Sequence, residues 1–302
     1  TTPMQDKSVG DLVETMQQWK IVMLSVSLLL VIALLFAGGL LRPGGFAKAG
    51  LRDVGGLPSV VWLFAIFVMF LAMSSAPQLI GKIQWIEDQQ YDQTQLDAIN
   101  TVGIYLFGII AGLGMLFVLH RSCVPSEGEG KCNSGLGLSF LDLPVGLGCF
   151  VLAYPFIELM NMLGVFAYTQ TQQAPTLVKL ENDPGNPWVW AIVGAAVIGA
   201  PFVEELIYRV FLQGALLKWL KSPWLAIIFS SLIFAGVHRV GGDEHGVPWH
   251  ALIPIFAVGL SCGIAYERTK RVGVPIMMHV CFNLYNVLLA VMISADASQT
   301  GV

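Results

Sequence analysis

The sequence predicts an all-α integral membrane protein with about eight transmembrane helices. Its 302 residues are 55% hydrophobic and 12% charged, whereas a soluble domain carries roughly 25% charged residues. The mean hydropathy is +0.70, and about eight apolar runs approach or exceed the length needed to cross a bilayer. The net charge of −4 is small and spread out. The sequence shows no basic patch, which predicts no contact with nucleic acid, whereas the apolar runs predict contact with the lipid bilayer.

The N-terminal part of the chain divides into a polar segment and a first group of spans. Residues 1–20 are polar, and we expect them to lie at the interface or to be loosely ordered. Residues 21–187 hold about four transmembrane helices with their loops. The apolar runs of this part are about 21–41, 58–80, 98–119 and 144–168. The last loop, 169–187, ends in a strong turn signal of prolines, glycine, asparagine and aspartate.

Residues 188–296 hold the remaining spans and form the predicted catalytic domain. Their apolar runs are about 188–220, 223–240, 247–266 and 274–295. The first is long for a single span, and Pro201 is expected to kink it. Lysine and arginine are roughly twice as frequent in the first, third, fifth and seventh loops, which predicts that these loops are cytoplasmic and that both termini lie outside.

The stretch 200–213 places charged side chains inside an apolar run. Glu205 and Arg209 are four residues apart on one helix face, with the acid first, which is the favourable order. Glu204 and Tyr208 form a second pair, turned by about 100° around the axis. Ionisable groups at membrane depth cost roughly 2.5–3.5 kcal/mol each. Glu204 has no partner from its own helix, which indicates a functional role for it. Glu205 and Arg209 fit a buried structural ion pair at least as well as a catalytic role.

Two later runs carry polar residues with the same spacing. His238 follows Phe234 by four residues, and Asn283 follows His279 by four, so each pair lies on one helix face. A carboxylate and an imidazole facing a hydrated pocket can deprotonate a water, and a second imidazole with an amide can stabilise the resulting oxyanion. The alternatives are an interfacial histidine for His238 and a hydrogen bond between helices for Asn283.

Together these motifs resemble a known family. Their order on successive apolar runs is that of the CPBP family, the CaaX prenyl protease type-II-like intramembrane endopeptidases, also called the Rce1 or ABI family. The resemblance covers about residues 188–295. The motifs that carry it are Glu204-Glu205-x-x-x-Arg209, Phe234-x-x-x-His238 and His279-x-x-x-Asn283.

The resemblance implies a fold, an activity and a role for each motif residue. The fold would be a bundle of about eight helices around an intramembrane site that opens to the cytosol. Glu204 and His238 would activate the water, and His279 and Asn283 would stabilise the oxyanion. The supporting residues would be Glu205, Arg209, Phe234 and Tyr208.

Metal dependence stays open at this point. Glu204, His238 and His279 would make a three-ligand zinc site with an open position. No cofactor is favoured, because one glutamate cannot easily be both the ligand and the base. The chain also contains no H-E-x-x-H sequence of zinc peptidases. Residues 259–263 fit the G-x-S-x-G pattern of serine hydrolases, but within an apolar run they are more typical of close helix packing.

We therefore expect an intramembrane endopeptidase in a bacterial plasma membrane. Its substrate would be a membrane-associated protein or peptide, hydrolysed by a water that Glu204 and His238 activate. One alternative is a proton-coupled transporter, because intramembrane Glu, Arg and His also form ion relays. Another is a non-catalytic partner subunit with the same fold, whose partner subunits the sequence does not identify.

Overall fold

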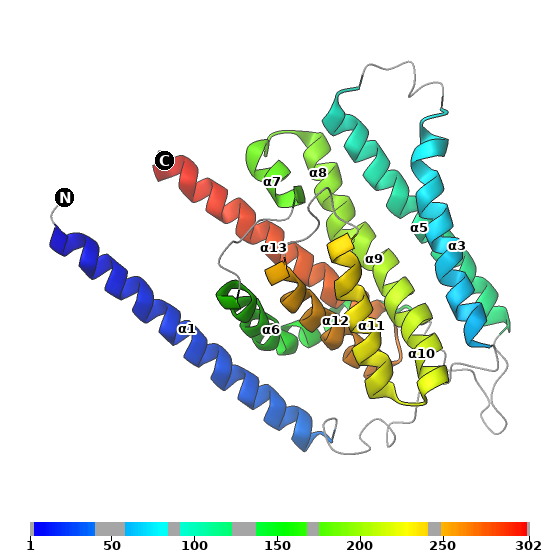
Figure 1. Cartoon of the computed structure of the whole chain (residues 1–302), viewed down its shortest axis with the longest axis horizontal. Helices are drawn as coiled ribbons and strands as arrows, with labels where there is room; N and C mark the ends of the chain where they lie inside the picture. The colour runs from blue at the N-terminus through cyan, green and yellow to red at the C-terminus, as the bar shows by residue number, and fades with distance from the viewer. Residues whose placement is uncertain are drawn as a thin grey trace.

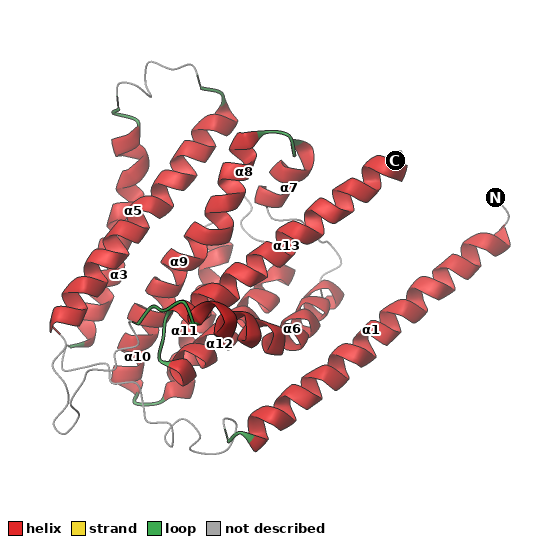
Figure 2. Ribbon diagram, turned by 180° about the vertical axis from the view of Figure 1, so that it is seen from behind, coloured by secondary structure: helices red, strands yellow, loops and turns green. Residues whose placement is uncertain are grey.

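The computed structural model is helical throughout the part of the chain that it describes. It describes residues 3–39, 58–83, 91–122, 137–167, 175–240 and 249–300. Within these ranges no strand occurs (Figures 1 and 2). Seven helices have the length and apolar composition to cross a membrane, and Pro223–Arg239 is a shorter apolar helix. The predicted all-α polytopic class is confirmed, with seven long apolar helices and one shorter one within the described residues.

The N-terminal helices are α1 (Pro3–Ala37), α3 (Ser59–Ile80), α5 (Gln93–Ser122) and α6 (Asp142–Ala167). Two boundaries differ from the prediction. Helix α1 already begins at Pro3, so residues 3–20 of the predicted polar segment are helical. Helix α5 begins inside the predicted loop 81–97, because Asp92 and Gln95 each accept a 2.9 Å hydrogen bond from the other's backbone N–H and so form a capping box.

The loop predicted at 169–187 contains a short helix that the sequence analysis missed, α7 (Pro175–Asn182). Lys179 of α7 is 2.6 Å from the carboxylate of Asp97 on α5. Asn186 then caps the next helix by accepting a hydrogen bond from the backbone N–H of Trp188 at 3.0 Å. Parts of the predicted loops lie outside the described residues, namely residues 40–57, 84–90, 123–136, 168–174 and 241–248.

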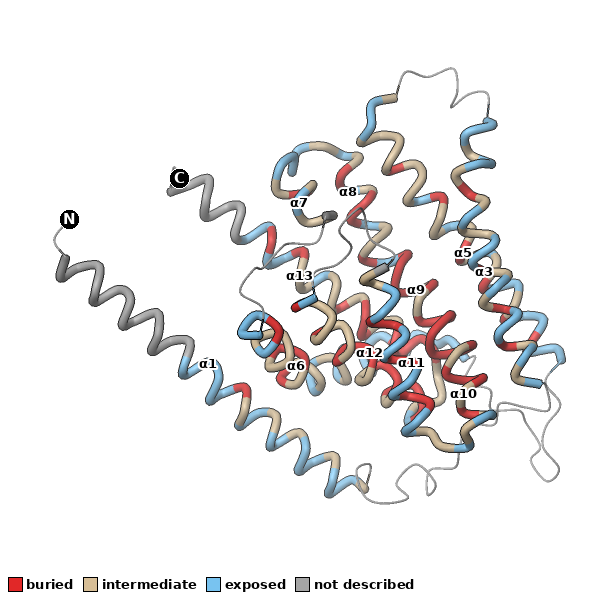
Figure 3. Tube along the Cα trace, in the orientation of Figure 1, coloured by how far each residue is buried: buried red, intermediate tan, exposed pale blue. Residues whose placement is uncertain are grey.

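One continuous helical run, 187–220, passes through the middle of the bundle. It consists of α8 (Pro187–Gly194), the π-helical segment η1 (Ala195–Gly199), α9 (Ala200–Glu205), a second π-helical segment η2 (Leu206–Leu212) and α10 (Gln213–Leu220). The irregularity predicted at Pro201 is thus the π-helical turn that directly precedes it. In the most apolar stretch of this run 56% of the residues are buried, whereas only 6% are buried in the corresponding stretch of α1. It is the core of the fold (Figure 3).

The remaining helices are α11 (Pro223–Val240), α12 (Trp249–Thr269) and α13 (Gly273–Thr300). They pack on one side of the central run, and α3 and α5 pack on the other (Figure 1). The close approach of α5 depends on Gly112, where a β-carbon would lie 2.7 Å from Leu206 Cδ1. Helix α1 stands at the edge of the bundle and packs mainly on α6. The predicted orientation in the membrane stays a prediction.

Candidate active site

Glu204, at the inner end of α9, faces two imidazole rings from different helices. Its Oε2 atom lies 3.8 Å from Nε2 of His238 on α11 and 3.8 Å from Nε2 of His279 on α13. Oε2 is buried and has no hydrogen-bond partner among the described residues. The structure therefore brings together three residues that the sequence motifs had singled out, while the catalytic roles assigned to them remain predictions.

Hydrogen bonds on the far side of each ring fix how the two histidines present themselves. His238 Nδ1 lies 2.8 Å from the carbonyl oxygen of Phe234, and His279 Nδ1 lies 3.0 Å from Glu205 Oε1. Because both oxygens are acceptors, each Nδ1 carries the proton and donates it. In the neutral state both rings then turn the lone pair of Nε2 toward Glu204.

Three hydrogen-bond acceptors thus face one space: the Glu204 carboxylate and the Nε2 atoms of His238 and His279. A separation of 3.8 Å is too long for a direct hydrogen bond and suits a bridging water. A water has two protons to donate, so it can bond two of these three acceptors at one time. The arrangement is therefore suited to holding a water and to moving protons on and off it.

Glu205 joins this site to a buried ion pair. Its Oε2 accepts a 2.8 Å hydrogen bond from Arg209 Nε, and both side chains have 0% exposure. Its Oε1 accepts the bond from His279 described above, so one carboxylate holds both a guanidinium and an imidazole. Arg209 Nη1 and Nη2 have no partner within the described ranges. The guanidinium carbon lies 5.0 Å from the centre of the Phe234 ring, a cation–π distance.

Phe234 is the apolar centre around which these groups are arranged. Its ring meets His238 at 4.7 Å between centroids, His279 at 5.7 Å and Tyr208 at 5.1 Å, with interplanar angles of 70°, 87° and 73°. These are edge-to-face contacts, a favourable geometry for aromatic pairs. Phe234 is 1% exposed. It therefore holds both imidazoles in place and excludes water from behind them.

Asn283 is bound elsewhere. Its Nδ2 donates a 2.9 Å hydrogen bond to the carbonyl oxygen of Ala196 in η1. This contact is the interhelical alternative that the sequence left open, and it ties α13 to the π-helical turn. It uses one of the two amide N–H groups, so the predicted role at the oxyanion would fall to the other.

Tyr105 on α5 lies beside the site and was not predicted. It packs so closely on Gly199 that a β-carbon there would lie 3.0 Å from Tyr105 Cβ. A tyrosine within an apolar run carries no signal of this kind, and α5 lies outside the predicted catalytic domain 188–296. The contact depends on the packing of two distant helices.

The donor atoms in the site are of the kinds that zinc takes. Glu204, His238 and His279 offer a carboxylate and two imidazole nitrogens, and an acceptor holds Nδ1 of each ring, as is usual behind zinc ligands. Within the described residues, however, no group of three or more His, Cys, Asp or Glu side chains is gathered closely enough to hold a metal ion. The zinc site stays a prediction.

The G-x-S-x-G pattern in α12 is a packing feature, as expected. Ser261 donates a 2.8 Å hydrogen bond to the carbonyl oxygen of Ala257 in its own helix. A β-carbon at Gly259 would lie 3.1 Å from Phe234 Cδ1, and one at Gly263 would lie 2.9 Å from Ile227 Cγ2. The two glycines therefore let α12 approach α11, and Gly259 helps to place Phe234.

A carboxylate and two imidazoles enclosed by apolar helices define a polytopic membrane protein with an intramembrane acid–base site. Residues 186–285, which include all three motifs, match the model of the Type II CAAX prenyl endopeptidase Rce1-like family. The putative membrane peptidase YdiL of Bacillus subtilis (strain 168) is 32% identical over 228 residues, which are 74% of this chain and 85% of that protein. The chain belongs to this Rce1-like family, as the motifs predicted.

A second relative is similar over a shorter stretch of the chain. The membrane-embedded CAAX protease MroQ of Staphylococcus aureus (strain USA300) is 33% identical over 98 residues, which are 31% of this chain and 36% of that protein. No solved structure matches the chain. Family membership and the apolar helices together make the chain an integral membrane protein of a peptidase family.

Proposed function

We propose that the protein is an intramembrane endopeptidase of a bacterial plasma membrane. It hydrolyses a peptide bond in a membrane-associated protein or peptide. The observation that carries the proposal is the buried Oε2 of Glu204, which lacks a hydrogen-bond partner among the described residues and faces two imidazole nitrogens at 3.8 Å. Membership in a peptidase family supports it.

The first step is activation of a water held between Glu204 and His238. His238 Nδ1–H donates a hydrogen bond to the carbonyl oxygen of Phe234. Nε2 of the same ring is therefore free to accept a hydrogen bond from the water and orient it. Glu204 takes one proton from the water as a general base. The water oxygen then bonds to the carbonyl carbon of the scissile peptide, and the carbonyl oxygen becomes an oxyanion.

The second step needs a hydrogen-bond donor for that oxyanion. His279 directs its Nδ1 proton to Glu205, so it donates to the oxyanion from Nε2 only when the ring carries a second proton. Asn283 contributes its second amide N–H. When the tetrahedral intermediate collapses, Glu204 returns the proton to the leaving amine, the C–N bond breaks, and a carboxylic acid and an amine are released.

Peptide cleavage by the purified protein in bilayers or mild detergent tests the proposal. Glu204→Gln and His238→Ala should each lower kcat by about 10² to 10⁴, the usual contribution of a positioned general base. Ser261→Ala is the matched control, since its hydroxyl only bonds within its own helix, and it should cleave like the parent. If Glu204→Gln retains full activity, this mechanism is wrong. If only Ser261→Ala is inactive, a serine nucleophile replaces it.

Two further measurements separate the remaining alternatives. A metal chelator should leave cleavage unchanged; loss of activity that zinc restores would instead support zinc held by Glu204, His238 and His279. A parent protein that cleaves no peptide but moves protons across liposomes in a manner dependent on Glu204 would replace the peptidase with the transporter.

A further inference from the structure

A second polar cluster lies among the apolar spans, away from Glu204. Lys20 Nζ on α1 is 2.6 Å from Glu158 Oε1 on α6. The Glu158 side chain is 9% exposed and that of Lys20 is 51% exposed. An acid inside a span requires a partner, and Lys20 supplies it from another helix. The pair is a principal polar contact between α1 and the bundle.

Two tyrosines extend this cluster on the side of the bundle. The hydroxyls of Tyr154 on α6 and Tyr285 on α13 are 3.0 Å apart, and their rings meet edge to face at 5.4 Å. Only one hydroxyl donates in such a bond, so the other keeps its proton for a further acceptor. The cluster therefore has spare donors at two points, this hydroxyl pair and the Lys20 ammonium, which uses one of its three N–H groups on Glu158.

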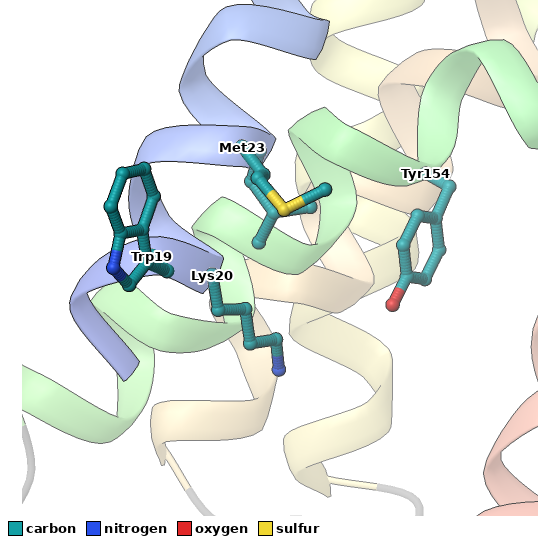
Figure 4. Close-up of a pocket in the computed structure, with 5 residues that line it drawn as sticks. Trp19, Lys20, Met23 and Tyr154 are labelled. Carbon is teal, nitrogen blue, oxygen red and sulfur yellow. The ribbon is translucent and has the colours of Figure 1, made fainter. Parts of the chain in front are cut away.

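A cavity of about 430 Å³ opens beside these donors, between α1 and α6 (Figure 4). Its size lies in the range of small-ligand sites, roughly 300–1,000 Å³. Figure 4 shows the Lys20 amine and the Tyr154 hydroxyl pointing to the same side of the view. The lining residues are Trp19, Lys20, Met23, Leu24 and Tyr154. The walls are thus apolar, with a cation at one end.

The order of these residues along α1 matches the polarity of a bilayer leaflet. Trp19 and Lys20 stand at the polar end of the span Gln18–Ala37, where tryptophan and lysine normally lie at the level of the lipid headgroups. Met23 and Leu24 are one turn further into the span. A ligand with its anionic group at Lys20 and its chain along these two residues has the orientation of a membrane lipid.

The lining of the cavity indicates what it can bind. Its walls are apolar, and Lys20 is the one charged residue among those that line it. The nearly buried Glu158 carboxylate lies behind Lys20, so the accessible charge is positive. An anionic headgroup with a flexible chain fits both observations.

We propose that this cavity binds a phospholipid from the surrounding bilayer. Lys20 and the Tyr154 hydroxyl contact its phosphate, and Met23 and Leu24 contact an acyl chain. The lipid fills the space between α1 and the rest of the bundle. This site does not depend on the proposed peptidase activity.

Native mass spectrometry of the full chain released from nanodiscs tests the proposal. The probes are phosphatidylglycerol and a diacylglycerol with the same chains but no phosphate. The parent should retain one phosphatidylglycerol at least tenfold better than the diacylglycerol. Lys20→Met should lower that retention about tenfold, as expected for loss of one charge-assisted contact. Lys82→Met is the matched control, since Lys82 is an exposed lysine at the end of α3, and should change nothing.

A second variant separates lipid binding from loss of the ion pair. Leu24→Trp fills the cavity and leaves Lys20 and Glu158 in place, so it should also reduce retention of the phospholipid. Equal retention by the parent, Lys20→Met and Leu24→Trp would overturn the proposal. So would equal retention of the two probes, which would show that the phosphate is not recognised.

Discussion

Replacing Arg209 by methionine should destabilise the bundle more than any exposed charge change. The substitution keeps an apolar stem of similar length but removes the guanidinium that bonds Glu205 at 2.8 Å and lies 5.0 Å from the centre of the Phe234 ring. Both members of the ion pair are 0% exposed. Glu205 would then be a buried carboxylate with His279 as its remaining partner.

The expected magnitude follows from that burial. Removing one member of a buried ion pair costs about 3–5 kcal/mol, because the other charge stays uncompensated. Replacing both members with neutral groups removes that penalty, so Arg209→Met combined with Glu205→Gln should be at least about 2 kcal/mol more stable than Arg209→Met alone. The glutamine still offers an oxygen to His279.

Urea unfolding in detergent, followed by tryptophan fluorescence, measures these differences. Arg121→Met is the matched control: Arg121 also lies over a phenylalanine ring, at 5.2 Å from the Phe117 centroid, but it is exposed, so its loss should cost no more than about 1 kcal/mol. The reasoning fails if Arg209→Met matches the parent within about 0.5 kcal/mol, or if the double variant is no more stable than the single one.

Three further substitutions test the packing around the site. Gly164→Ala should lower the free energy of unfolding in urea by about 1–3 kcal/mol, because its β-carbon would meet the backbone carbonyl of His250. Gly148→Ala on the same helix is its control: that β-carbon meets nothing within 4 Å, so the free energy of unfolding should stay the same or rise by up to about 1 kcal/mol. If the Tyr105 hydroxyl bonds the reacting groups beside Glu204, Tyr105→Phe should lower kcat up to about tenfold with KM unchanged, because one hydrogen bond contributes about 0.5–1.5 kcal/mol; an unchanged kcat would remove Tyr105 from the site. Phe234→Leu should lower both kcat and the unfolding midpoint, since both imidazoles lose their edge contacts; unaltered kinetics would show that the ring does not hold them.

The meeting of Glu204, His238 and His279 was predictable because each lies in an i,i+4 motif on a separate apolar run. Ionisable groups inside membrane spans seldom persist without a partner or a function, so these three residues were expected to face one another. The positions of Glu205 and Phe234 behind the two imidazole rings were harder to predict from the sequence. Their hydrogen bond and ring contacts depend on helix rotations that a spacing pattern does not specify.

Other features were present in the sequence and overlooked. Asp92 and Gln95 have the spacing of a capping box, which places the start of α5. Glu158 lies within the fourth apolar run, and Lys20 at the edge of the first, so a partnership between them was open to inference. The packing of Tyr105 on Gly199 joins residues far apart in the sequence. No local pattern predicts that contact.

The two π-helical segments let the central run carry extra residues without losing its helical phase. A π-helical turn holds one residue more than an α-helical turn, whereas an extra residue in a regular α-helix would rotate everything after it by about 100°. Because η1 takes up its extra residue within one turn, Glu204 keeps its direction relative to α8. A relative that is one residue shorter at Ala195–Gly199, with a regular turn there, would therefore still direct Glu204 toward His238 and His279.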